Sequence, residues 1–181
     1  MPDPLDAAPE SLDVPAEPLN AAPGPHGPPG AGREPLELAY RYLNRRDRTE
    51  GEVRKHLAGK GVEPDAVEGA IETLREQGYV DDARYARLFA EDKRALEGWG
   101  TERIRGTLAL RGIDRDLIEA AVVADGGNGS EMERALEILR RRFPAPPRER
   151  RDRDRALAVL LRKGYDTDLA LDALTAHARG S

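Results

Sequence analysis

Two aspartates stand side by side in the stretch EQGYVDDARYA, residues 76–86, and are the residues of this sequence that most resemble a reactive site. Paired carboxylates, here Asp81 and Asp82, can hold a metal ion or exchange protons with a substrate. Carboxylates can equally well begin a helix, because they accept hydrogen bonds from the free N–H groups of its first turn. The elements around the pair must decide between these two uses.

The rest of the chain offers little to complete a metal or catalytic site. It has no cysteine, and its three histidines, His26, His56 and His177, are too far apart to form a local ligand group. The patterns G-x-x-x-x-G-K-[ST], H-E-x-x-H and G-x-S-x-G are all absent. We therefore expect a protein that is not an enzyme and uses no metal or cofactor. A hydrolase acting through Asp81 and Asp82 is the least favoured alternative.

The composition favours small helical modules. Of the 181 residues, 39% are hydrophobic, 35% are charged and only 4% are aromatic, which is too thin a core for a thick α/β enzyme. The sequence has no apolar run long enough to span a membrane, and its first residues do not have the pattern of a signal peptide. We expect a cytoplasmic protein that does not contact membranes.

The first 33 residues differ from the rest. They contain nine prolines, and their five Asp and Glu residues against a single Arg give a net charge of −4 out of −5 for the whole chain. Such a segment lacks the apolar surface that would offset its ordering entropy. We expect residues 1–33 to be a disordered acidic tail, and the remainder, being nearly neutral, to bind partners through local charge patterns.

A threefold repeat organises the remainder. The segments LAGKGVEPDAVEGAI, LALRGIDRDLIEAAV and LLRKGYDTDLALDAL align on Gly61, Gly112 and Gly164, which are 51 and 52 residues apart. Each segment has a leucine four residues before the glycine, a base directly before it and an aspartate four residues after it. The glycine suits a left-handed turn between two helices, with the base at the end of one helix and the aspartate at the start of the next.

Apolar spacing predicts three helices in each repeat. We expect an all-α protein of three tandem three-helix repeats, about nine helices, over residues 34–80, 81–127 and 128–181. Capping boxes are expected at Thr49–Glu52 and Ser130–Glu133, a helix end near Phe143, and a linker at residues 125–129. The expected buried positions are Leu36, Ala39, Tyr40, Leu43, Val67, Ala70, Ile71 and Leu74 in the first repeat, Tyr85, Leu88, Phe89 and Leu96 in the second, and Met132, Ala135, Leu136 and Leu139 in the third.

The repeat places the aspartate pair at a junction. Gly78 ends the last helix of the first repeat, Tyr79 can turn inward, and Asp81 or Asp82 can cap the next helix, which carries Tyr85. The pair is therefore interpreted as structural.

Charge separates the second helix of each repeat from the third. The third helices are acidic, so DNA phosphates would repel them from a major groove. The second helices are basic and could form a discontinuous stripe that binds a partner or DNA, or their bases could simply pair with neighbouring acids. Both interpretations stay open for the first two repeats, whereas binding is favoured for Arg140–Arg155. The candidate binding residues are Arg54, Lys55, Lys60, Arg103, Arg105, Arg111, Arg140, Arg141, Arg148, Arg150, Arg151, Arg153 and Arg155.

Trp99 is the only tryptophan, and it lies between two glycines just before a helix. If partly exposed it would be a candidate anchor for a partner. Packing across the turn between two helices is the favoured alternative.

Two stretches, GYVDDARYARLF (78–89) and GWGTERIRGTLALRGI (98–113), resemble the RecX family of bacterial recombination regulators. RTEGEVRKHLAGKGV in the first repeat fits as well, with threonine where the family often has serine. The resemblance covers about residues 36–178, and the third repeat, with its insertion PAPPRERRDRDR, is the most divergent. The residues that carry the family motif are Gly61, Gly78, Tyr79, Asp81, Asp82, Tyr85, Gly112 and Gly164.

The resemblance implies an elongated, slightly curved array of repeats and a monomeric, non-enzymatic protein. It implies binding to the RecA recombinase, above all to its filament on single-stranded DNA, and restraint of RecA's ATPase and strand exchange. The alternative function is that of a stand-alone DNA-binding protein acting through the basic second-helix faces.

Overall fold

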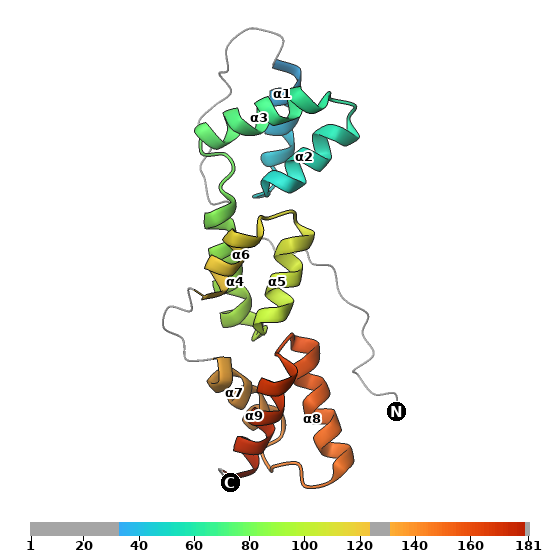
Figure 1. The fold of residues 1–181 in the computed structure, drawn as a ribbon, viewed down its shortest axis with the longest axis vertical. Coiled ribbons are helices and arrows are strands. Elements are labelled where there is room, and N and C mark those ends of the chain that lie inside the picture. Colours follow the sequence, from blue (N-terminus) through green and yellow to red (C-terminus); the bar gives the residue numbers. More distant parts are fainter. Residues whose placement is uncertain (1–32, 124–130, 180–181) are drawn as a thin grey trace. The chain divides into compact units, whose positions relative to one another are not determined.

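The computed structural model describes residues 33–123 and 131–179. Within these ranges the chain forms nine α-helices and no strand, grouped in three repeats of three helices (Figure 1). Residues 1–32 of the expected tail, the linker at 125–129 and the capping residue Ser130 lie outside the described residues, whereas Arg33, also expected in the tail, begins the first helix. The repeat limits remain predictions. The helices are α1 (Arg33–Leu43), α2 (Glu50–Gly59), α3 (Pro64–Glu76), α4 (Asp82–Glu97), α5 (Thr101–Leu110), α6 (Arg115–Val123), α7 (Glu131–Arg142), α8 (Arg150–Lys163) and α9 (Thr167–Arg179).

The chain divides into two compact units. Unit 1 contains residues 33–48 and 53–80, and unit 2 contains residues 49–52, 81–123 and 131–179. The first turn of α2 therefore belongs to unit 2, whereas the rest of that helix packs in unit 1. None of the helices in the described residues is both long and apolar enough to cross a membrane.

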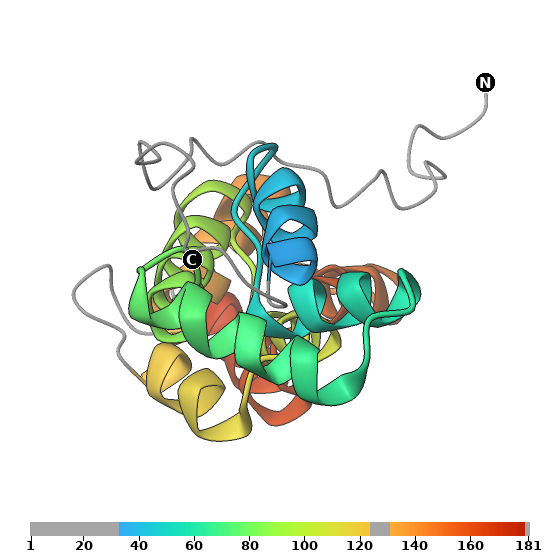
Figure 2. The same cartoon turned by 90° about the horizontal axis from the view of Figure 1, so that it is seen from above.

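The core of unit 1 forms where α3 packs against α1, which it crosses in both views (Figures 1 and 2). The predicted apolar stripe of α3 is confirmed, since all four of its residues are buried. The Tyr40 hydroxyl donates a hydrogen bond of 2.6 Å to Gln77 Oε1, and the Tyr40 and Tyr79 rings lie 5.0 Å apart. The buried core residues are Ala39, Val53, Leu57, Val67, Ala70, Ile71, Leu74 and Val80.

The second repeat has one misplaced prediction, because Leu96 is 79% exposed. The buried face of α4 is made by the small residues Ala86 and Ala90, which leave room for α6, and by the buried side chains of Lys93 and Arg94. Leu96 lies about a quarter-turn away from this face at 100° per residue. Size alone is therefore a poor guide to the buried side of this helix.

The third repeat has its own core, built from α7, α8 and α9. Its predicted first-helix positions are confirmed: Ala135 and Leu139 are buried, and Met132 and Leu136 pack against the core. Helix α7 ends at Arg142, next to the expected end, because Pro144 restricts the residue before it and cannot donate a backbone hydrogen bond.

Each repeat has the predicted left-handed glycine turn. The φ angles of Gly61, Gly112 and Gly164 are 79°, 79° and 83°, and no residue other than glycine has a positive φ in the described part of the chain. In all three turns the residue after the glycine donates its N–H to the carbonyl of the leucine four residues before the glycine, at 3.1 to 3.3 Å. The repeat alignment thus identifies real structural equivalents.

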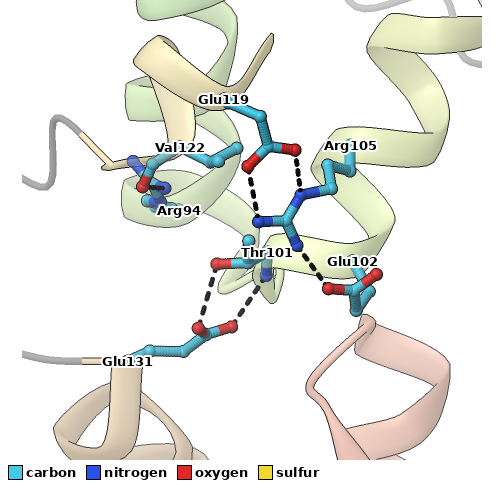
Figure 3. Close-up of polar contacts among 7 residues, drawn as sticks. All are labelled: Arg94, Thr101, Glu102, Arg105, Glu119, Val122 and Glu131. Carbon is cyan, nitrogen blue, oxygen red and sulfur yellow. Dashed lines mark hydrogen bonds and ion pairs between the residues drawn. The ribbon is translucent and has the colours of Figure 1, made fainter. Parts of the chain in front are cut away.

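Repeats 2 and 3 meet within unit 2 through their backbones, at a contact that we call the joint. The N–H groups of Gly100 and Glu102 donate hydrogen bonds of 2.8 and 3.0 Å to the carbonyl oxygens of Lys163 and Gly164. No side chain fits here, because a Cβ on Gly100 would lie 2.3 Å from Gly164 O. Nearby, the carboxylate of Glu131 accepts hydrogen bonds from the N–H and hydroxyl of Thr101, at 2.7 and 2.9 Å (Figure 3).

A similar contact involves the first turn of α2, whose residues 49–52 belong to unit 2. The Thr49 hydroxyl donates to Arg111 O at 2.5 Å, and a Cβ on Gly51 would lie 2.8 Å from Gly112 Cα. The predicted capping box is confirmed, because Glu52 N donates to Thr49 Oγ1 at 3.1 Å and Thr49 N donates to Glu52 Oε2 at 3.2 Å. In both contacts a helix start with a glycine meets a glycine turn.

Candidate functional site

The aspartate pair has structural partners. Asp81 caps α4, because its carboxylate accepts a hydrogen bond of 2.9 Å from Arg84 N. Asp82 is buried, and its carboxylate accepts the N–H of Glu50, also at 2.9 Å, so it serves the start of a second helix. No group of three or more His, Cys, Asp or Glu side chains that could hold a metal ion occurs among the described residues. The pair therefore joins two helix starts.

Arg54 and Arg105 are held by glutamates. Each lies seven residues before its repeat glycine, and its partner, Glu68 or Glu119, lies seven residues after it. The pairs are bidentate, with Nε–Oε1 distances of 2.6 and 2.7 Å and a second hydrogen bond of 3.0 Å in each. These hydrogen bonds lower the pKa of both glutamates. Arg105 also contacts Glu102 (Figure 3), so neither arginine presents an unpaired charge.

Arg111 is also engaged in the fold. Its guanidinium lies 3.4 Å from the Glu52 carboxylate and donates a hydrogen bond of 2.6 Å to the hydroxyl of Tyr85. For the second helices of repeats 1 and 2, pairing thus accounts for Arg54, Arg105 and Arg111. Lys55 and Lys60 remain exposed, and neither forms an ion pair within the described part of the chain.

Trp99 is buried, with only 3% of its surface exposed, so the alternative of a partly exposed anchor is not supported. Its ring meets Phe89 edge-on at 6.1 Å. The Arg103 guanidinium lies 3.9 Å from the ring centre and covers it as a cation–π partner. Packing across the turn is therefore the role that this geometry supports.

The third repeat replaces the bidentate pair with leucines. The positions seven residues before and after Gly164 are Leu157 and Leu171, so α9 holds no arginine of α8 in this way. The arginines near the start of α8 are exposed, and within the described residues their one ion pair is a 4.0 Å contact between Arg150 and Asp154. Such an exposed pair is worth little. The exposed arginines of this segment are Arg148, Arg150, Arg151, Arg153 and Arg155.

Further cations lie near the joint. Arg103 Nη1 donates to Arg162 O at 3.3 Å, and Lys163 Nζ donates to Glu97 O at 2.5 Å. Burial lowers the pKa of Lys163, and the charges of Arg141, Arg103 and Arg142 lower it further. Arg162 shares a face of α8 with Arg155 and Arg151, at spacings of seven and four residues.

We call Arg103 of α5, together with the Lys and Arg residues between positions 140 and 163, the repeat-3 basic surface. It contains three cations absent from the sequence-based selection, Arg142, Arg162 and Lys163; the helical spacing of Arg162 was the signal that could have found it. Residues 131–179 hold twelve Lys and Arg against nine Asp and Glu, whereas residues 33–80 hold nine against ten and residues 81–123 eight against nine. The surface comprises Arg103, Arg140, Arg141, Arg142, Arg148, Arg150, Arg151, Arg153, Arg155, Arg162 and Lys163.

These features define a class: an all-α protein of tandem three-helix repeats with an excess of basic residues in the third repeat and no assembled catalytic group among the described residues. Family models for RecX match at residues 36–74, its first three-helix domain, and 81–122, its second. The Regulatory protein RecX of Xanthomonas campestris pv. campestris (strain B100) is 35% identical over 133 residues, 73% of this chain and 80% of that protein. The chain belongs to the RecX family, which is known in general as a family of RecA regulators.

Two other proteins extend the comparison. The Regulatory protein RecX of Deinococcus radiodurans is 39% identical over 130 residues, covering 72% of this chain and 61% of that protein. The crystal structure of RecX from Lactobacillus salivarius matches with a TM-score of 0.69 at 22% identity, covering 83% of this chain and 97% of that one. This structural likeness establishes the shared helical repeat fold.

Proposed function

We propose that this protein is a cytoplasmic, non-enzymatic regulator that binds the RecA filament on single-stranded DNA and lowers its ATPase and strand-exchange activities. The observation that carries the proposal is the identity of 35 to 39% with Regulatory protein RecX sequences over about three quarters of the chain. A regulator of this kind acts by binding. This agrees with the structural role of Asp81 and Asp82, whose carboxylates accept hydrogen bonds at two helix starts.

The repeat-3 basic surface supports a specific contact region. A RecA filament on DNA presents phosphates and protein carboxylates, and guanidinium groups bind both through paired hydrogen bonds. Cations already paired within the fold must break that pairing before they bind a new anion. Arg54 and Arg105 are paired, whereas Arg151, Arg155 and Arg162 have no ion pair within residues 33–123 and 131–179, so repeat 3 supplies the readily available positive charge.

The test is the RecA ATPase on single-stranded DNA, measured against increasing amounts of this protein, with strand exchange measured in parallel. We expect both activities to fall with the wild-type chain, and the combined variant Arg151→Gln, Arg155→Gln, Arg162→Gln to need at least about tenfold more protein. The matched control, Arg84→Gln, Arg87→Gln, Arg115→Gln, removes the same charge from exposed positions of repeat 2 and should act as the wild type does. Unchanged ATPase, strand exchange and filament length at excess wild-type protein would refute the proposal.

Direct binding to DNA is the second candidate function, and it is favoured because the α8 arginines have no bidentate acid partner in the part of the chain that the structure describes. Its test is fluorescence anisotropy on labelled single-stranded DNA, without RecA, over a salt series. Each phosphate contact contributes about 0.7 to the slope of log K against log salt for single strands. The triple α8 variant should therefore lower the slope by about 2, and the repeat-2 control should not. A flat salt dependence in the wild type would exclude this function while leaving RecA binding open.

A further inference from the structure

The glycine turn of repeat 1 differs from the other two in what surrounds it. In the described residues a Cβ on Gly61 would meet nothing within 4 Å, whereas one on Gly112 would lie 3.0 Å from Gly51 Cα and one on Gly164 would lie 2.2 Å from Arg103 Cβ. The three turns have closely similar backbones, with φ between 79° and 83°. The turns of repeats 2 and 3 are therefore contact surfaces, whereas the equivalent turn of repeat 1 is uncovered in the described residues.

The two covered turns show which groups this surface accepts. Each receives the first turn of a helix, whose donors reach the turn carbonyls: the Thr49 hydroxyl reaches Arg111 O, and the N–H groups of Gly100 and Glu102 reach Lys163 O and Gly164 O. At the start of each incoming helix a glycine lies against the backbone of the turn: Gly51 is the second residue of α2, and Gly100 is the N-cap residue of α5. Helix starts have spare N–H groups, and the turns supply carbonyl oxygens that accept them.

The base before the glycine also finds an acceptor in each covered turn. Arg111 contacts the carboxylate of Glu52, and Lys163 donates to the carbonyl oxygen of Glu97. The equivalent Lys60 is exposed, and in the described part of the chain neither its side chain nor the carbonyl oxygens of Lys60 and Gly61 has a hydrogen-bond partner. The uncovered turn thus offers the same acceptors and the same cation, all unused.

We propose that the turn at Lys60–Gly61 is a docking surface for the first turn of a helix from a partner protein, one that carries a glycine there and an oxygen acceptor for Lys60. This interaction is separate from the anion binding of the repeat-3 basic surface and does not depend on the proposed function.

A second copy of this chain is not the occupant. Among the second helices, the starts of α2 and α5 already contact a glycine turn, and the remaining start is that of α8, residues 148–155, with the sequence RERRDRDR and no glycine. The two observed contacts need glycine because a Cβ would come within 2.3 to 2.8 Å of backbone atoms. The side chains of α8 therefore block head-to-tail extension, and the free turn is left to a different protein.

The probe is a helix-stabilised peptide with the sequence of residues 97–111, which contains Glu97, Gly100 and Glu102, titrated into the isotopically labelled full chain. We expect saturable NMR shifts at residues 58–62 and none at residues 109–113 or 161–165, whose turns are covered. A peptide with Gly100→Leu should bind at least about tenfold more weakly, because its side chain would meet the turn backbone. The Lys60→Glu chain should also bind the original peptide more weakly.

Gly61→Asn is the decisive variant of the chain. Asparagine tolerates the left-handed conformation better than other side chains, and the space around Gly61 is open, so the fold and its melting temperature should be retained. The new side chain stands where the incoming helix must approach, so peptide binding should fall at least tenfold. Three results would overturn the proposal: no shifts at millimolar peptide, equal shifts at all three turns, or unchanged binding in the folded Gly61→Asn chain.

Discussion

Replacing Gly100 with alanine tests the joint between repeats 2 and 3. The new methyl carbon would lie 2.3 Å from Gly164 O and 2.4 Å from Tyr165 N, distances that no real contact tolerates. The atoms in the way are backbone, so they cannot rotate aside as a flexible side chain could. The helix start must move back from the turn, and the hydrogen bonds from Gly100 N to Lys163 O and from Glu102 N to Gly164 O must lengthen or break.

The expected loss of stability can be estimated from the hydrogen bonds and the helix cap that the substitution weakens. Two backbone hydrogen bonds contribute about 1 kcal/mol each to net stability. Alanine is a poorer helix N-cap than glycine, which adds up to about 1 kcal/mol. Gly100→Ala should therefore lower the free energy of unfolding of unit 2 by about 3 kcal/mol. In a domain of about 100 residues this corresponds to a fall in melting temperature of about 12–24 °C.

The assay is thermal and urea unfolding of the full chain followed by circular dichroism, with Gly106→Ala as the matched control. Gly106 lies inside α5 with nothing within 4 Å of its added Cβ, so alanine there should stabilise the helix by about 0.5–1 kcal/mol. A loss of no more than about 1 kcal/mol in Gly100→Ala would match the capping term alone. That result would refute the tight backbone joint.

Three further predictions concern single side chains. Thr49→Ala should cost about 2 kcal/mol in denaturant unfolding, because it removes the cap and the hydrogen bond to Arg111 O, whereas Thr49→Ser should be close to wild type. The pKa of Glu119 is lowered by its hydrogen bonds with Arg105, so its contribution is present above the ordinary pKa of 4.5 and is lost as pH falls through the lowered value. Glu119→Gln should therefore lose less stability than the wild type between pH 6 and pH 3, and parallel curves would contradict this. Burial raises the pKa of Tyr165 from 10.0 to about 12, so its stabilising effect is lost as pH rises through that range. Ultraviolet titration should show a late ionisation that disappears in Tyr165→Phe.

Local features of the fold could be predicted from the sequence. A left-handed turn or a capping box depends on a few neighbouring residues, so Gly61, Gly112, Gly164 and the Thr49–Glu52 box are where the sequence placed them. The buried face of α4 could not be found in this way, because it depends on how closely α6 approaches. The small side chains of Ala86 and Ala90 allow α6 to pack closely, and the larger Leu96 remains exposed at the side of α4.

The joint and the charge pairing depend on which segments meet in space. Nothing local distinguishes Gly100, which lies against another backbone, from Gly106, which faces open space. The pairing could have been found by extending the repeat alignment, since Arg54 with Glu68 and Arg105 with Glu119 occupy the same two positions. At those positions the third repeat has Leu157 and Leu171. This difference in sequence indicates that the third repeat lacks the bidentate arginine–glutamate pair of the other two.

The backbone joint also affects how readily this protein can change its outer surface. Two of the hydrogen bonds across it join main-chain groups, and its tightest steric demand falls on Gly100 and Gly164. Outward-facing side chains such as Arg151 and Arg155 carry no part of that connection. Substitution at these positions can therefore retune which anions the surface attracts without loosening the scaffold, so specificity and architecture can be varied independently in engineered forms of this chain.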